Sequence, residues 1–103
     1  MEKKYKLVIS SLAQKDLENI FKYISIDLYN KKAASELINK FEKAFNELCI
    51  YPECCPKVNN EYLKEQNLRK LVVKYFIAFY RIVGNEIQIV RVLHELRDYK
   101  KHL

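Results

Sequence analysis

The side chains best suited to chemistry lie in the last forty residues of the chain. Among them is His94, and histidine is the side chain type most often used to give or accept a proton near neutral pH. Residues 64–103 also hold 9 basic and 4 acidic side chains, whereas residues 1–63 hold 10 and 9. This basic excess suits an acidic partner, either a nucleic acid or an acidic peptide segment, although a soluble basic surface explains it equally well.

The three cysteines are a second group with chemical potential. Cys49, Cys54 and Cys55 cluster around one turn, far in sequence from His94 and His102. Two adjacent cysteines rarely clamp one tetrahedral metal ion. We therefore expect ordinary reduced thiols and no metal or other cofactor, with a metal or redox role as the alternative.

Length and composition limit the elements that can position these side chains. The chain has 103 residues, of which 50% are hydrophobic, and only 1 Gly and 2 Pro. This is enough for one compact core and too little for two, so a single domain over residues 1–103 is expected, built from long elements and short turns. Because the sequence contains no signal-peptide pattern and no membrane span, a cytoplasmic protein without a membrane partner is expected.

The first half of the sequence predicts one strand and two helices. Tyr5 to Ile9 is a short apolar run typical of a strand. Ser11 with Gln14 forms a capping-box signature for a helix that extends to about Tyr29, and a second helix must end before Pro52. Apolar residues recur at spacings of three and four in both. They are Leu17, Ile20, Phe21, Ile24 and Leu28 in the first helix, and Ala34, Leu37, Ile38, Phe41, Ala44, Phe45 and Leu48 in the second.

The last third predicts three strands. The runs Leu68 to Val73, Tyr75 to Val83 and Glu86 to Leu93 are rich in Val, Ile, Tyr and Phe. Gly84-Asn85 between the last two is typical of a two-residue hairpin turn. Such a turn sets the register of the two strands, and counting back without interruption places Tyr75 opposite His94. That pair is either an acid/base pair or a histidine packed beside a tyrosine at a strand end.

The same register predicts the two faces of the sheet. One face would pair Ile77 with Val92 and Phe79 with Val90, and continue to Arg81 with Gln88. The other would carry Phe76, Ala78, Tyr80 and Ile82 against Leu93, Arg91, Ile89 and Ile87. Because both faces are mainly apolar, one should pack on the helical hairpin and the other should form an open or partner-covered groove.

The order strand, two helices, three strands, with a basic C-terminal block, resembles the RelE/ParE superfamily of toxins from type II toxin-antitoxin systems. The ending Ile89 to Asp98 is the most specific part, being similar to the pattern Ile-x-Arg-Val-x-His-x-x-Arg-Asp. The earlier matching residues are Ser10, Ala13, Asp16-Leu17, Ile20, Tyr23-Ile24, Leu48, Pro52, Arg69 to Val73, and Phe76 to Tyr80. The resemblance implies an α+β fold of order β-α-α-β-β-β, with a helical hairpin packed on a small, mainly antiparallel, twisted sheet.

The superfamily divides into two activities. RelE-like members cleave messenger RNA on the ribosome, and ParE-like members poison DNA gyrase without a known hydrolytic site. Both are neutralised by a cognate antitoxin, through which alone operator DNA is bound. The nuclease relatives place an Arg at the position of Ile77, whose apolar side chain cannot do that work. Together with the long helical hairpin, this favours the ParE-like activity, with the ribosome-dependent endoribonuclease as the alternative.

The resemblance also suggests which residues act. For a nuclease, the catalytic candidates are His94, Arg97 and Arg69. Candidates for binding the target or the antitoxin are Tyr75, Arg81, Arg91, Tyr99 and Lys100. The structural alternatives are an ion pair for Arg91, a solvent-facing side chain for Arg69, and a solvated tail for Arg97 and Lys100. A member that has lost toxicity and only binds antitoxin and operator remains a third possibility. The antitoxin is expected to use an amphipathic helix and a strand added at a sheet edge.

Overall fold

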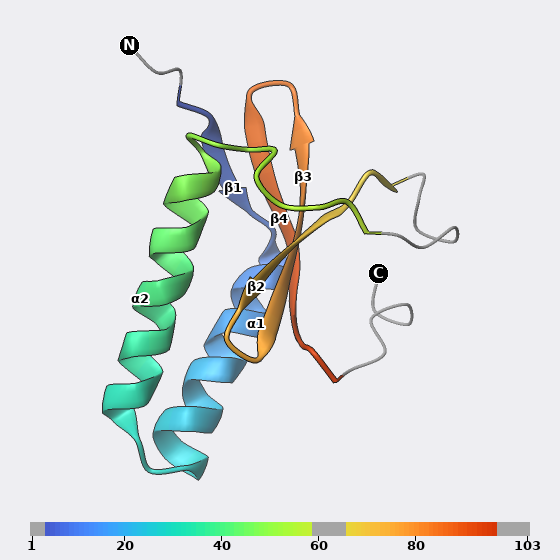
Figure 1. Cartoon of the computed structure of the whole chain (residues 1–103). Helices are drawn as coiled ribbons and strands as arrows, with labels where there is room; N and C mark the ends of the chain where they lie inside the picture. Colours follow the sequence, from blue (N-terminus) through green and yellow to red (C-terminus); the bar gives the residue numbers. More distant parts are fainter. Residues whose placement is uncertain (1–3, 59–65, 97–103) are drawn as a thin grey trace.

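The computed structural model describes residues 4–58 and 66–96 and has the order expected from the sequence. Two helices form a hairpin that packs on one face of a four-stranded sheet (Figure 1). The α+β class is therefore confirmed. The elements are β1 (Lys6–Ile9), α1 (Ser11–Lys22), a π-helical turn η1 (Tyr23–Asp27), α2 (Lys31–Leu48), β2 (Arg69–Val73), β3 (Phe76–Val83) and β4 (Glu86–His94).

The strands lie in the order β1-β4-β3-β2. β1 runs parallel to β4, whereas the other two pairs are antiparallel, so the sheet is mainly antiparallel as expected. The parallel pair joins the first and last strands of the chain, and Ile9 lies opposite Ile89. Since α1 begins directly after β1, this pairing places the start of α1 beside the second half of β4.

The helix boundaries differ from the prediction at two points. The N-cap of α1 is Ser10 rather than Ser11, because the Ser10 hydroxyl accepts the hydrogen bond from the Ala13 N–H at 3.0 Å. α1 ends at Lys22 instead of continuing as a regular helix to Tyr29. After Lys22 the backbone hydrogen bonds change to i→i−5, as in the bond from the Leu28 N–H to the Tyr23 carbonyl. In the same turn, the buried Ser25 hydroxyl donates to the Phe21 carbonyl at 2.7 Å. Such back-bonding competes with regular helix geometry.

The hairpin of β3 and β4 has the predicted turn but not the predicted register throughout. Gly84 has a φ of +59°, and Val83 lies opposite Glu86 as expected. The pairing shifts by one residue between Phe79 and Tyr80, because Val90 is an extra residue on β4. Beyond this β-bulge the prediction is wrong, and His94 lies opposite Phe76 instead of Tyr75.

The bulge also exchanges the two faces of the second half of β4. Val92 now packs in the core beneath the helical hairpin, and Leu93 packs on the other face, the reverse of the uninterrupted register. The faces of β3 are as predicted. A one-residue insertion reverses every later side chain because successive side chains of a strand point to opposite sides.

The main core lies between the sheet and the helical hairpin. Its largest fully buried members are Tyr80, Phe41, Phe45, Leu48, Ile87 and Ile89. A second cluster lies on the opposite face of the sheet, where Val58 and Leu68 bury Phe79 and Leu93. That part of the second face is covered by the chain itself, so the predicted open or partner-covered groove is wrong there. No helix among the described residues is long and apolar enough to cross a membrane.

Candidate functional site

A hollow of about 420 Å³ lies where α1 meets the ends of β3 and β4. It combines polar and apolar side chains from the first helical segment of the chain and from the β3–β4 hairpin, which are far apart in the sequence. Its lining residues are Asp16, Asn19 and Ile20 from α1, Tyr23 from η1, Phe76 from β3, and Val92, Leu93 and His94 from β4. The bulge at Val90 is what turns Val92 and His94 toward the side of α1.

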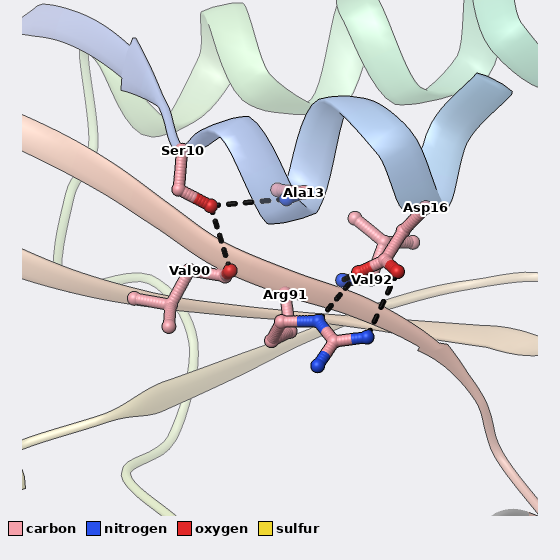
Figure 2. Close-up of polar contacts among 6 residues, drawn as sticks. All are labelled: Ser10, Ala13, Asp16, Val90, Arg91 and Val92. Carbon is pink, nitrogen blue, oxygen red and sulfur yellow. Dashed lines mark hydrogen bonds and ion pairs between the residues drawn. The ribbon is translucent and has the colours of Figure 1, made fainter. Parts of the chain in front are cut away.

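Asp16 fixes α1 to β4 at the inner edge of this hollow. Its carboxylate accepts hydrogen bonds from Arg91 Nε at 2.8 Å, from Arg91 Nη2 at 2.9 Å and from the Val92 N–H at 3.0 Å, as Figure 2 shows. The two charged side chains are only 15% and 13% exposed. The hydrogen bond to Asp16 raises the pKa of Arg91. The ion pair left open as an alternative for Arg91 is therefore present, and a binding role for this residue stays a prediction.

His94 stands at the outer edge of the hollow and is exposed. Its ring meets Phe76 edge to face, with ring centroids 5.4 Å apart at 82°. Its Nδ1 accepts the hydrogen bond from the Leu96 N–H at 3.1 Å, so the neutral ring carries its proton on Nε2. Because the facing ring is a phenylalanine, it cannot exchange a proton with the histidine. The predicted placement of Tyr75 opposite His94, left open as an acid/base pair or a packing contact, is wrong.

Tyr75 does not face His94 but lies in the turn that precedes Phe76. It occupies the two-residue turn between β2 and β3, with its side chain 64% exposed. Its carbonyl accepts a hydrogen bond from the Glu95 N–H at 2.9 Å. The turn that carries Tyr75 is therefore joined to the end of β4, and the phenol is accessible from solvent.

Arg69 and Arg81 are not brought to this hollow. Arg69 lies opposite Tyr80, and its Nη1 donates to the Cys55 carbonyl at 2.7 Å. Since His94 lies opposite Phe76, four positions along β3, Arg69 is about 13 Å away along the strands. Arg81 is one position farther still, where its Nε donates to Gln88 at 3.0 Å. Arg97, Tyr99 and Lys100 lie outside the described residues.

A family model described as the ParE toxin of the type II toxin-antitoxin system parDE matches residues 7–99. The chain belongs to the ParE toxin family. It is thus a toxin of the RelE/ParE superfamily of type II toxin-antitoxin systems.

Solved structures support the fold of this ParE-family toxin. A chain of the chromosomal ParDE system of P. aeruginosa is similar at 20% identity and a TM-score of 0.70, covering 88% of this chain and 96% of that one. A chain of the toxin-antitoxin complex RelBE2 of Mycobacterium tuberculosis is similar at 18% identity and a TM-score of 0.57, covering 88% and 98%. No curated protein matches the chain.

In this ParE-family toxin, Ile77 lies on the sheet face turned away from the hollow. It packs against the cluster formed by Val58, Leu68, Phe79 and Leu93. The position at which the nuclease relatives carry an Arg is thus part of an apolar layer. Nor do any three His, Cys, Asp or Glu side chains within residues 4–58 and 66–96 lie close enough together to hold a metal ion.

The part of the site contributed by α1 was missed as a site by the sequence reasoning. Asp16 was noticed only as part of a family pattern, although a signal for its role exists. It directly precedes Leu17 on the apolar stripe, so its carboxylate is carried to the border of the core, and Arg91 is a charged residue within a mostly apolar strand. Two opposite charges at the border of one core are stable only when paired.

Proposed function

We propose that this toxin arrests growth by inhibiting DNA gyrase, without cleaving RNA itself, and that a cognate antitoxin neutralises it. The observation that carries the proposal is the separation of His94 and Arg69, the two cleavage candidates among the described residues. Arg69 is about 13 Å along the strands from His94 and is bonded to the Cys55 carbonyl. The match to the ParE family supports the same target.

Cleavage of RNA requires groups that deprotonate the 2′-OH, stabilise the charge on the phosphate and protonate the leaving oxygen, all within reach of one bond. Around the hollow, the described basic side chain closest to His94 along β4 is Arg91, which Asp16 holds in an ion pair. Phe76 replaces the expected tyrosine partner. Among the described residues, these side chains are poorly suited to general acid/base catalysis.

Two assays run in parallel test the proposed target. Purified toxin at micromolar concentration should inhibit gyrase supercoiling of plasmid DNA, and adding the purified antitoxin in equal amount should restore it. The same preparation should produce no new 5′ ends in a message translated on purified ribosomes. Unchanged supercoiling would reject the gyrase proposal, and cleavage at codon boundaries would establish the nuclease alternative.

His94→Gln separates the two activities in cells. We expect the variant to arrest growth at the same inducer concentration as the wild type, because a gyrase inhibitor needs no proton transfer at this position. A nuclease that relied on His94 as an acid or base would lose about 100-fold or more in rate. Glu95→Gln, which changes the exposed neighbouring residue, serves as the control for altered expression or folding.

For the antitoxin, the closed end of the helical hairpin is the best supported surface. This end extends past the β2–β3 turn in Figure 1. Large apolar side chains there are exposed to an extent unusual for a folded monomer. They are Tyr23, Ile26, Leu28 and Tyr29, with exposures of 54%, 61%, 54% and 92%. An amphipathic antitoxin helix would bury these side chains in its apolar face.

The β2 edge of the sheet bears on where the antitoxin could add a strand. On the outer edge of β2, the Lys70 N–H already donates to the Pro56 carbonyl, and Lys57 forms a bridge with Arg69. Val72, two residues farther along, is 58% exposed. On this edge of the sheet, an added antitoxin strand would pair near Val72, where this segment of the toxin no longer covers β2.

A charge at the hairpin end should weaken the antitoxin complex. We expect Ile26→Asp to reduce antitoxin affinity at least about tenfold, because an exposed anchor worth more than 1 kcal/mol would become a buried charge. Leu12→Asp is the matched control, since Leu12 is also exposed, at 57%, but lies at the opposite end of α1. Titration calorimetry measures both. Equal affinities for the two variants would place the antitoxin helix elsewhere.

A further inference from the structure

Cys54 and Cys55 form a pair of thiols whose sulfur atoms are 3.5 Å apart. They lie in the segment between α2 and β2, where Cys54 is exposed and Cys55 is partly buried. Cys49, the remaining cysteine, is buried in the main core. The pair therefore presents two sulfurs side by side, at least one of which is open to solvent.

Contacts from the sheet hold this turn in place on both sides of the pair. The Tyr80 hydroxyl donates to the Pro52 carbonyl at 2.8 Å, and Arg69 Nη1 donates to the Cys55 carbonyl at 2.7 Å. The Lys70 N–H donates to the Pro56 carbonyl at 3.1 Å. Because the backbone is fixed before any ligand arrives, less conformational freedom is lost when both sulfurs bind one atom.

The distance between the two sulfur atoms indicates whether they suit a disulfide bond or the binding of one shared atom. A disulfide bond is about 2.05 Å long and joins Cα atoms at least about 4.4 Å apart, whereas neighbouring trans residues have Cα atoms about 3.8 Å apart. Two sulfur bonds of about 2.3 Å to one atom, at angles between 90° and tetrahedral, span about 3.3 to 3.8 Å. The observed 3.5 Å matches such a two-sulfur chelate.

The number of protein ligands at this site limits which metal or metalloid atom the two thiols could bind. Structural zinc takes four ligands. In the described part of the chain, the two thiols are not joined by a further His, Cys, Asp or Glu into a cluster that could hold a metal ion. An atom that needs only two protein sulfurs therefore fits this site better than zinc does. Trivalent arsenic with one organic substituent is such an atom, because it is soft, pyramidal and satisfied by two thiolates.

The surroundings of Cys54 offer space for that organic substituent. An open hollow of about 610 Å³ borders this residue. Its other lining residues are Tyr5, Ile50, Tyr51, Pro52 and Glu53. Two tyrosine rings, an isoleucine and a proline provide apolar and aromatic contacts for a flat ring of the size of phenyl.

We propose that Cys54 and Cys55 together form a binding site for monosubstituted trivalent arsenic, of the arylarsonous acid class. Each thiol condenses with one hydroxyl on arsenic, so that two arsenic–oxygen bonds break, two arsenic–sulfur bonds form and two water molecules leave. No oxidant or reductant is consumed. Partial desolvation by neighbouring atoms and the hydrogen bond with Cys55 raise the pKa of Cys54, so its thiol carries the proton that leaves in water.

Phenylarsine oxide, which hydrates to the arsonous acid, is the probe. The full chain is reduced with a phosphine, mixed with one equivalent and challenged with excess glutathione, a monothiol. We expect one adduct by intact mass that resists glutathione and is removed by a small dithiol. Cys54→Ser and Cys55→Ser should each weaken retention about 100-fold or more, because a single arsenic–sulfur bond lacks the second, intramolecular attachment.

Cys49→Ser is the matched control and should bind like the wild type. Circular dichroism establishes that each variant is folded, and Cys54→Ser is decisive because the exposed thiol can be replaced without disturbing the core. Loss of binding in Cys49→Ser, or undiminished retention in folded Cys54→Ser, would overturn the proposal. So would a wild-type protein that forms no adduct.

Discussion

Replacing Asp16 with alanine is expected to lower the free energy of unfolding by about 3 kcal/mol. The carboxylate accepts three hydrogen bonds, two from the mostly buried guanidinium of Arg91 and one from the Val92 N–H. Its removal takes away a charge partner of Arg91 and the acceptor of the Val92 N–H at the wall of the hollow. Urea denaturation measures the effect as a shift in midpoint at unchanged slope.

Two further variants show whether charge burial is the cause. Glu18→Ala, an exposed substitution on the same helix, should stay within about 0.5 kcal/mol of the wild type. Asp16→Ala combined with Arg91→Met should regain part of the loss, since no charge is then carried into the core border. A loss below about 1 kcal/mol for Asp16→Ala alone would mean that water replaces the carboxylate and that the ion pair does little for stability.

Ser10→Ala should have the second largest effect on stability, lowering the free energy of unfolding by about 2 kcal/mol. The variant loses both the N-cap of α1 and one further hydrogen bond. The Ser10 hydroxyl accepts from the Ala13 N–H at 3.0 Å and donates to the Val90 carbonyl at 2.8 Å (Figure 2). One side chain thus both starts α1 and binds the carbonyl of the bulged residue. Thermal unfolding followed by circular dichroism measures the loss.

Ser11→Ala is the informative control, because the sequence pattern had indicated Ser11 as the cap. Ser11 is exposed and occupies the first turn of α1. Its replacement should change stability by no more than about 0.5 kcal/mol. If Ser11→Ala proved the more damaging of the two, the cap would lie where the sequence pattern put it, and the link from Ser10 to the bulge would contribute little.

Local signals in the sequence were sufficient for most of the secondary structure. The recurrence of apolar residues at three and four positions gave α2 and most of α1, since it depends only on helix geometry. Gly84-Asn85 gave the β3–β4 turn and the pairing of Val83 with Glu86. The same patterns predicted the order of elements on which the resemblance to the RelE/ParE superfamily rested, and the structure confirms that order.

The positions of the candidate site residues depended on contacts that local patterns do not contain. Arg69 was a reasonable partner for His94 by residue type, yet β2 begins opposite Tyr80 and directs Arg69 to the Cys55 carbonyl. Asp16 is 75 positions from Arg91 in the sequence. Periodicity places each of these on an element, but only the packing of α1 beside β4 makes them an ion pair.

By itself, the sequence determined that this is a small α+β chain of the toxin superfamily and that Ile77 is apolar where nuclease relatives carry an Arg. The tertiary structure decided which residue faces His94. An extra residue in β4 is accommodated because Ser10, the residue between β1 and α1 and 80 positions earlier in the chain, donates its hydroxyl hydrogen bond to the Val90 carbonyl. The hairpin turn sets the register only as far as the bulge, and beyond it the non-local contact with β1 places Phe76, not Tyr75, against the histidine.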